Sequence, residues 1–166
     1  APVTSDMFGS IPSLPNLNRV ELRSTDVDDS GLESLAGMKE VTFLNLANTK
    51  LSDAGLRHVS NLPKLTTLVL GSTGIGPEGV RHIGNMASLR ALYLYDTKVD
   101  DGALKNLMKL KDLNALFLMY TNVSDNGMVH LSELRNLKFI NLEGTKVTHV
   151  GIKLLQDALP GCMIQR

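Results

Sequence analysis

The sequence predicts an α/β repeat protein in which a short strand and a helical return alternate along the chain. The main observation is a threonine that recurs every 24 residues, together with two apolar positions before it and a helical pattern after it. The threonines are Thr25, Thr49, Thr73, Thr97, Thr121 and Thr145. A fixed period of this length is typical of solenoid proteins. We therefore expect one domain over 1–166, with an N-terminal half-repeat at 1–16, six repeats at 17–158 and a C-terminal edge at 159–166.

The strand of each unit is predicted by alternation before the threonine, as in "ALYLYD", where leucines alternate with tyrosines. Successive side chains of a strand point to opposite faces. The positions three and five before each threonine are apolar in every unit, so we assign them to the core. They are Leu22, Leu46, Leu70, Leu94, Leu118 and Leu142, and Val20, Leu44, Leu68, Leu92, Leu116 and Ile140. Ile164 stands where a further strand would begin, which suggests a closing edge.

A helical return of about ten residues is predicted after each corner, because apolar residues follow at spacings of three, as in Leu104, Leu107 and Leu110. Asp53, Asp101 and Asp125 stand where negative charge suits the helix dipole, and Pro77 takes that place in the third unit. Residues that can cap the helix starts precede this position: Asp28, Ser52, Asp100, Ser124 and Thr148.

The six threonines are expected to have a structural role. A buried hydroxyl is nearly always hydrogen-bonded. We expect each one to bond to the backbone of the next turn of the solenoid, so that the column forms a ladder. Before the first strand, Val3, Phe8, Ile11 and Leu14 are in register with the helical half of a preceding unit.

The segment "LNALFLMYTNVSDNGMVHLSEL" carries the whole pattern of one unit and resembles the leucine-rich repeat family. It is most similar to the 24-residue bacterial type found in planctomycetes, which is related to the ribonuclease-inhibitor-like class. The resemblance implies a right-handed solenoid with a parallel concave β-sheet and convex helices. It also implies a protein-binding role.

Composition excludes several kinds of partner and site. Lys plus Arg equals Asp plus Glu at 17 each, so neither nucleic acid nor an anionic membrane is an expected partner. Cys162 is the only cysteine, which excludes an internal disulfide and a cysteine-based zinc site, and we expect it to be a small apolar filler. The sequence has no apolar run of the roughly 18 residues that a membrane helix needs. We expect a soluble monomer, and the compartment stays open.

The candidate functional site is the strand face that points away from the core. All three tyrosines and three of the four phenylalanines fall there or at its rim, flanked by Glu21, Arg23, Asn141 and Glu143. Apolar patches with polar rims mark interaction sites, and tyrosine is enriched at binding hot spots. Two alternatives are that the rings stabilise the sheet by cross-strand packing, or that they pack on another part of a longer array. The predicted partner-binding residues are Tyr93, Tyr95, Phe117, Met119, Tyr120, Val69, Phe43 and Phe139.

Two further motifs could indicate a nucleotide site or a metal site, but the sequence supports them less well than the aromatic strand face. "GIGPEG", Gly74 to Gly79, matches the dinucleotide-binding pattern, but Ile75 is a core position of the repeat and Glu78 would place negative charge beside a pyrophosphate. His58, His82 and His130 share one helical position, yet Arg57 and Arg81 beside two of them would repel a cation. We therefore expect no metal, no cofactor and no catalytic residue.

The function predicted from sequence is that of a non-enzymatic module that binds a protein or peptide on its concave aromatic face. The alternative is a structural segment of a longer repeat array or a multidomain protein. In that case the strand at Leu17 to Arg23, or the edge at Ile164, would pair with another chain or with further repeats.

Overall fold

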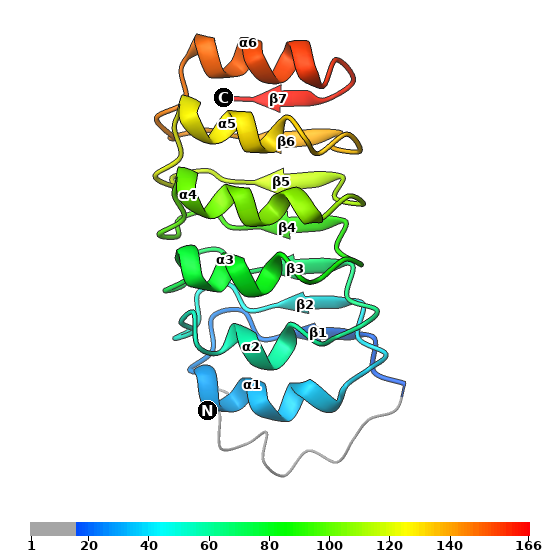
Figure 1. Ribbon diagram of the computed structural model, residues 1–166. Helices are drawn as coiled ribbons and strands as arrows, with labels where there is room; N and C mark the ends of the chain where they lie inside the picture. Colours follow the sequence, from blue (N-terminus) through cyan, green and yellow to red (C-terminus); the bar gives the residue numbers. More distant parts are fainter. Residues whose placement is uncertain (1–15) are drawn as a thin grey trace.

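The structure, a computed structural model, describes residues 16–166 and forms a stack of strand–helix units (Figure 1). Each strand pairs in parallel with the next one along the chain, which gives a single sheet in the order β1 to β7. The predicted α/β solenoid is confirmed. Val3, Phe8, Ile11 and Leu14 lie outside the described residues. The strands are β1 (Arg19–Glu21), β2 (Phe43–Asn45), β3 (Thr67–Val69), β4 (Ala91–Tyr93), β5 (Ala115–Phe117), β6 (Phe139–Asn141) and β7 (Met163–Gln165).

The register of the sheet follows the repeat, because partners in neighbouring strands are 24 residues apart. Leu92 pairs with Leu116, and Tyr93 pairs with Phe117. The seventh strand lies where Ile164 predicted it and pairs with β6. One column of the sheet therefore holds one position of the repeat.

The helices form a second layer on one face of the sheet (Figure 1). Only α6 has the predicted ten residues; the others are shorter, and two continue as tighter 3₁₀ turns, which bring the chain back to the sheet in fewer residues. The helical segments are α1 (Asp29–Glu33), η2 (Ser34–Gly37), α2 (Leu56–Val59), α3 (Pro77–Ile83), α4 (Asp101–Leu104), η3 (Lys105–Lys109), α5 (Asp125–Leu131) and α6 (His149–Ala158).

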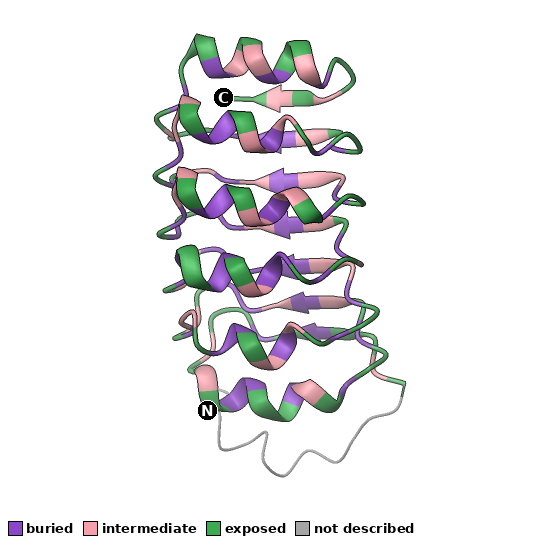
Figure 2. Ribbon diagram, in the orientation of Figure 1, coloured by how far each residue is buried: buried purple, intermediate pink, exposed green. Residues whose placement is uncertain are grey.

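The core lies between the two layers and consists of the repeating apolar positions (Figure 2). Leu92, Leu94, Leu104 and Leu107 have no exposed surface, as the sequence pattern predicted. Among the described residues, no buried side-chain nitrogen or oxygen lacks a hydrogen-bond partner.

Each repeated threonine bonds within its own turn, so the predicted ladder of hydroxyls to the next turn was wrong. The Oγ1 atom of Thr97 donates to the carbonyl oxygen of Leu94, three residues earlier, at 2.6 Å. The other five threonines make the same bond to the leucine three residues before them. The hydroxyl closes the corner locally because the carbonyl of its own turn lies within reach of a short side chain.

The bonds that cross from one unit to the next at the helix starts come from aspartates instead. Asp101 accepts from the backbone N–H of Ser124 at 2.7 Å and from its hydroxyl. Asp29, Asp53 and Asp125 make the equivalent bond to Ser52, Gly76 and Thr148. These bonds hold the pKa of the Asp125 carboxyl below its usual range, chiefly through the hydroxyl and then the backbone N–H of Thr148. We call these four bonded pairs the aspartate ladder.

The predicted N-caps are confirmed at four of five helix starts. The side chains of Asp28, Asp100, Ser124 and Thr148 accept from backbone N–H groups of the first turn. Ser52 is the exception. Its hydroxyl accepts from the N–H of Ala54 at 3.3 Å, but α2 begins only at Leu56, after Gly55.

The aspartate ladder is interrupted once, between α3 and α4, where the sequence departs from the repeat at three positions together. Pro77 replaces the aspartate, and Asp100 stands where the units that accept an aspartate from the preceding unit have Ser52, Gly76, Ser124 and Thr148. Ala103 stands where the other units have glycine, and it is fully buried. With no carboxylate arriving from the preceding unit, the methyl group of Ala103 has room.

Candidate functional site

The strand face opposite the helices is made of three columns of side chains, one for each outward position of the strand. The column at the strand starts holds Phe43 and Phe139, and the middle column holds Val69, Tyr93 and Phe117. The positions two before each threonine, just beyond the strands, form the third column, which contains Tyr95 and Met119. The sequence assigned all of these residues to this face, and the strand register confirms the first two columns.

Three aromatic rings form a continuous stack across β4, β5 and β6. The rings of Tyr93 and Phe117 are parallel to within 5° with centroids 4.1 Å apart. The ring of Phe139 contacts Phe117 at 5.1 Å, tilted by 42°. Aromatic pairs contribute roughly 0.5–1.5 kcal/mol each beyond burial. We call Tyr93, Phe117 and Phe139 the ring stack.

Tyr95 lies over the neighbouring repeat towards the N-terminus. A Cβ atom on Gly71 would fall within the ring of Tyr95, so the absence of a side chain at Gly71 is what allows the ring to lie there. Gly71 is buried as a result. This packing was not visible in the sequence, because a strand glycine alone does not show which neighbour approaches it.

Tyr120 lies over the neighbouring repeat in the opposite direction. A Cβ atom on Gly144 would overlap the Tyr120 ring, and the Tyr120 hydroxyl donates to Glu143 Oε1 at 2.9 Å. This hydrogen bond, and then the charge of Glu143, raises the pKa of the Tyr120 phenol. The residue is nevertheless 60% exposed.

The backbone of Tyr120 is in the left-handed region, with φ of 57°. The equivalent corner residues also have positive φ, and they are glycine or residues with short polar side chains: Ser24, Asn48, Ser72, Asp96 and Gly144. An aromatic residue is an outlier in this conformation, which costs of order 1–2 kcal/mol. Outliers of this kind cluster at functional sites.

The predicted patch differs from the observed one in exposure and in extent. Tyr93, Tyr95, Phe117, Met119 and Phe139 are half-buried rather than fully exposed, and Val69 is buried at 9% exposure. The rings of Tyr93, Phe117 and Phe139 cover one another, and Tyr95 lies over Gly71. Phe43 is not part of the ring stack. The guanidinium of Arg19 lies 3.6 Å from the centroid of the Phe43 ring, in a cation–π contact. The site is therefore centred on β4 to β6 and the Tyr120 corner.

The polar flank at β1 and β2 is bonded within itself. Arg19 pairs with Glu21, and Asn45 Nδ2 donates to Glu21 at 2.8 Å. At the other flank, Asn141 is buried and its Oδ1 accepts from the N–H of Glu143 at 2.9 Å. These polar groups are hydrogen-bonded within the chain, so the ring stack and the exposed ring of Tyr120 are the apolar part of this face that a partner can cover.

Sequence reasoning missed the charged residues at the two edges of this face, because only the outward columns were considered. Arg90 and Lys138 directly precede β4 and β6, and Asp96 follows β4 at its corner. All three are exposed. The sequence did hold a signal for the basic pair: of the six residues that stand seven before a repeated threonine, Arg90 and Lys138 are the two basic ones.

The other motifs do not form competing sites. In "GIGPEG" the N–H of Gly76, which a phosphate would use, already donates to Asp53 at 2.7 Å. His58, His82 and His130 lie on separate helices, and within residues 16–166 no group of three or more His, Cys, Asp or Glu side chains is placed to hold a metal ion. Cys162 packs beside the core, where burial raises the pKa of its thiol.

Over the described chain, no helix is long and apolar enough to cross a membrane. The helices contain between four and ten residues, whereas a spanning helix needs about 20.

Comparison with known proteins identifies the repeat. The profile described as Leucine Rich repeat matches residues 13–36 and 61–84, each one period long. The fold is a leucine-rich-repeat solenoid. No curated protein matches the sequence. The planctomycete-like and ribonuclease-inhibitor-like subtype stays a prediction.

Solved structures share this leucine-rich-repeat fold at low sequence identity. An internalin, InlF, from Listeria monocytogenes superposes with a TM-score of 0.66 at 18% identity, over 97% of this chain and 49% of that one. A leucine-rich-repeat protein from Leptospira interrogans gives 0.69 at 20%, over 92% and 38%. Internalin C2 from Listeria monocytogenes gives 0.64 at 21%, over 92% and 73%. This chain thus spans about half or less of the length of the first two.

Proposed function

We propose that this leucine-rich-repeat chain is a non-enzymatic recognition module that binds a protein or peptide on its strand face. The ring stack and Tyr120 form the contact surface, with Tyr95 and Met119 beside them. The observation that carries the proposal is the exposed Tyr120, which has a left-handed backbone and follows β5, the central strand of the ring stack. Leucine-rich repeats generally serve protein–protein interaction, which is consistent with this use of the face.

Sheet stabilisation accounts for part of the aromatic content, but not for Tyr120. The Tyr93–Phe117 contact does stabilise the sheet. Tyr120 lies outside the strands, has an unfavourable φ and keeps more than half of its surface in solvent. A partner that covers this ring would gain apolar burial that the isolated chain does not.

The test compares three immobilised proteins as baits in a lysate, with captured proteins identified by mass spectrometry. They are the wild type, the Tyr93→Ala/Phe117→Ala variant, and a control, Val129→Ala/Val150→Ala, which removes two exposed apolar side chains of α5 and α6. We expect one or more proteins to bind the wild type and the control but not the ring variant. Retention by the ring variant, or no capture specific to the wild type, would contradict the proposal.

A stability control accompanies this experiment. Loss of the stack should cost roughly 0.5–1.5 kcal/mol beyond the lost burial, so the ring variant will unfold at a lower temperature than the wild type. Capture is therefore measured well below the unfolding transition of the ring variant.

The rival proposal is assembly through a sheet edge. β7 pairs with β6 on one side only, and its Met163 is 67% exposed. Unpaired edges are templates for pairing with another chain. Light scattering over a concentration series separates the two proposals, since edge assembly gives a mass that grows with concentration and strand-face binding leaves a monomer.

A further inference from the structure

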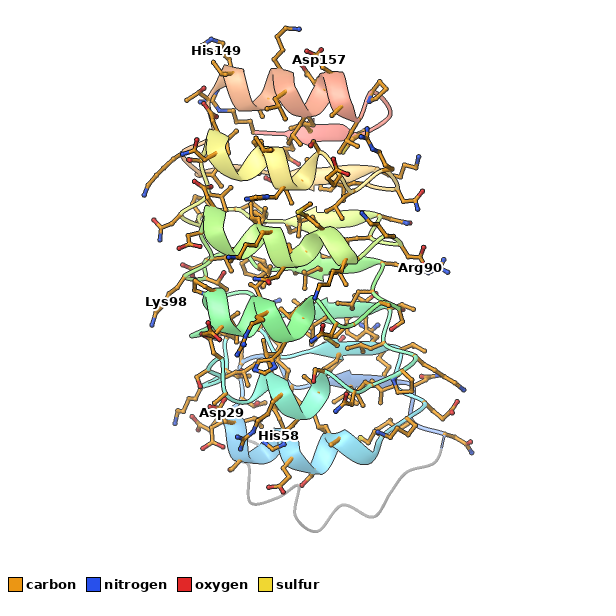
Figure 3. The ribbon with its side chains drawn as sticks, viewed as in Figure 1. Asp29, His58, Arg90, Lys98, His149 and Asp157 are labelled. Carbon is orange, nitrogen blue, oxygen red and sulfur yellow. The ribbon has the colours of Figure 1, made fainter. Side chains whose placement is uncertain are left out.

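The ring stack lies between basic residues at the side of the sheet where the strands begin and acidic residues at the side where they end. We call these two sides the strand-start edge and the strand-end edge, as distinct from the open edge strand β7. Arg90 and Lys138 are at the start of β4 and β6, and Asp96 and Glu143 are at the end of the same two strands. All four side chains are exposed. Because every strand runs in the same direction, all strand starts share one edge (Figure 1). In Figure 3, Arg90 projects from that edge and Lys98 from the opposite one.

The cations at the strand-start edge beside the ring stack have no carboxylate partner within the described chain. Arg90, Lys111 and Lys138 make none of its five ion pairs. Further towards the N-terminus, where no ring stack is present, Lys64 on the same edge is paired with Glu40 at 2.6 Å. The free cations thus coincide with the aromatic part of the face.

Acidic groups on this edge do not neutralise these cations. Asp112 and Glu133 lie in the same set of loops, but neither forms an ion pair. Arg135, also in these loops, donates to the carbonyl oxygen of Ala158 at 3.1 Å. These loops contain the cations Arg90, Lys111, Arg135 and Lys138 against the carboxylates of Asp112 and Glu133, so the charge next to the ring stack is positive in sum.

The surface between these cations and the ring stack is open to a ligand, because small residues occupy it. Ala91 and Ala115 hold the first outward position of β4 and β5, directly after the edge, and are half-buried. Each has only a methyl group there. A side chain that enters from this edge can therefore reach Tyr93 and Phe117.

We propose, building on the proposed function, that the occupant of this face is an extended segment of another protein that carries acidic residues next to an apolar anchor. The anchor lies against the ring stack over Ala91 and Ala115, and the carboxylates contact Arg90 and Lys138. Arg–carboxylate pairs are charge-assisted and directional. Asp96 and Glu143 repel carboxylates at the other edge, so the segment binds in one direction.

Charge complementarity of this kind selects partners and speeds association more than it adds affinity. Lys98 and Lys146 lie beyond the strand-end corner, after the threonine, and Lys146 is bonded to Asn122 at 3.1 Å. They are thus separated from the ring stack by the acidic corner. An acidic segment therefore has its favourable contacts at the strand-start edge.

The test uses a random twelve-residue peptide library displayed on phage, selected against four proteins. These are the wild type, Arg90→Glu/Lys138→Glu, the control Lys98→Glu/Lys105→Glu with the same change of charge away from the ring stack, and Tyr93→Ala/Phe117→Ala. We expect the wild type and the control to enrich peptides with Asp or Glu beside an aromatic or aliphatic residue. A selected peptide, made synthetically, should bind the Arg90→Glu/Lys138→Glu variant with an affinity at least about tenfold lower than its affinity for the wild type. Raised salt should weaken its binding to the wild type.

The outcomes distinguish the two proposals. Peptides that depend on Tyr93 and Phe117 but show no acidic preference would overturn the inference and leave the proposed function standing. The same holds if Arg90→Glu/Lys138→Glu binds the acidic peptides as well as the wild type does. Absence of any enriched peptide that depends on the ring stack would overturn both. Circular dichroism of each variant checks that it is folded.

Discussion

The carboxylate of Asp101 occupies the space that a side chain on Gly127, one repeat later, would need. A Cβ atom on Gly127 would lie 2.6 Å from Asp101 Oδ1 and 2.7 Å from a methyl carbon of Leu104. The recurrent glycine is therefore required by the neighbouring unit and not by its own backbone angles. The aspartate and the glycine act together: the carboxylate bonds to the next turn, and the glycine leaves the space for it.

Substitution of this glycine should destabilise the solenoid. Gly127→Ala forces a methyl group against Asp101 and Leu104, and overpacking of this kind costs about 1–3 kcal/mol. Urea unfolding followed by circular dichroism measures the change. The control is Gly102→Ala, where the nearest atom would be 3.5 Å away, and which should be neutral or stabilise by roughly 0.5–1 kcal/mol. Equal effects of the two substitutions would contradict this account.

The missing step of the aspartate ladder can be restored only by three changes together. Pro77→Asp supplies the carboxylate, Asp100→Ser supplies its donors and removes a like charge, and Ala103→Gly gives it room. Hydrogen bonds to a charged group contribute roughly 1.5–3 kcal/mol, so the triple variant should have a free energy of unfolding higher by about 1–3 kcal/mol. Thermal and urea unfolding provide the measurement.

Pro77→Asp alone is the control for the triple variant. Its carboxylate would meet Asp100 and the buried Ala103, so we expect no gain in stability or a loss. A gain from the single substitution as large as that of the triple variant would show that the three positions do not act together.

Titration of Tyr120 should depend on Glu143. The hydrogen bond to Glu143 raises the phenol pKa, so the folded chain holds this proton more tightly than the unfolded chain. The resulting stability is fully present below the ordinary tyrosine pKa and is lost as pH rises through the raised value. Glu143→Gln should move the Tyr120 pKa back towards its ordinary value.

Absorbance of the tyrosinate anion against pH measures this effect. In a Tyr93→Phe/Tyr95→Phe background Tyr120 is the only tyrosine that titrates. An unchanged Tyr120 pKa after Glu143→Gln would contradict the hydrogen bond. A shift in the same direction after the Asp96→Asn control would point to a general field effect instead.

The repeat, the strand positions and the core were determined by the sequence, because a strict period fixes which residue of one unit lies beside which residue of the next. Leu92 beside Leu116 and Tyr93 beside Phe117 follow from that period alone. The seventh strand at Met163–Gln165 was found in the same way. Helix length was less predictable, since the apolar spacing of three suits both an α-helix and a 3₁₀ turn.

Only the tertiary structure decided how side chains are shared between units. A period shows that Thr97 and Asp101 recur, but not that Thr97 bonds to its own turn while Asp101 bonds to the next. It shows that Tyr95 and Tyr120 leave the core, but not that they lean in opposite directions over Gly71 and Gly144. The physical reason is that each choice depends on the space and the donors left by a residue 23 or 24 positions away, which becomes a neighbour only when the chain has coiled.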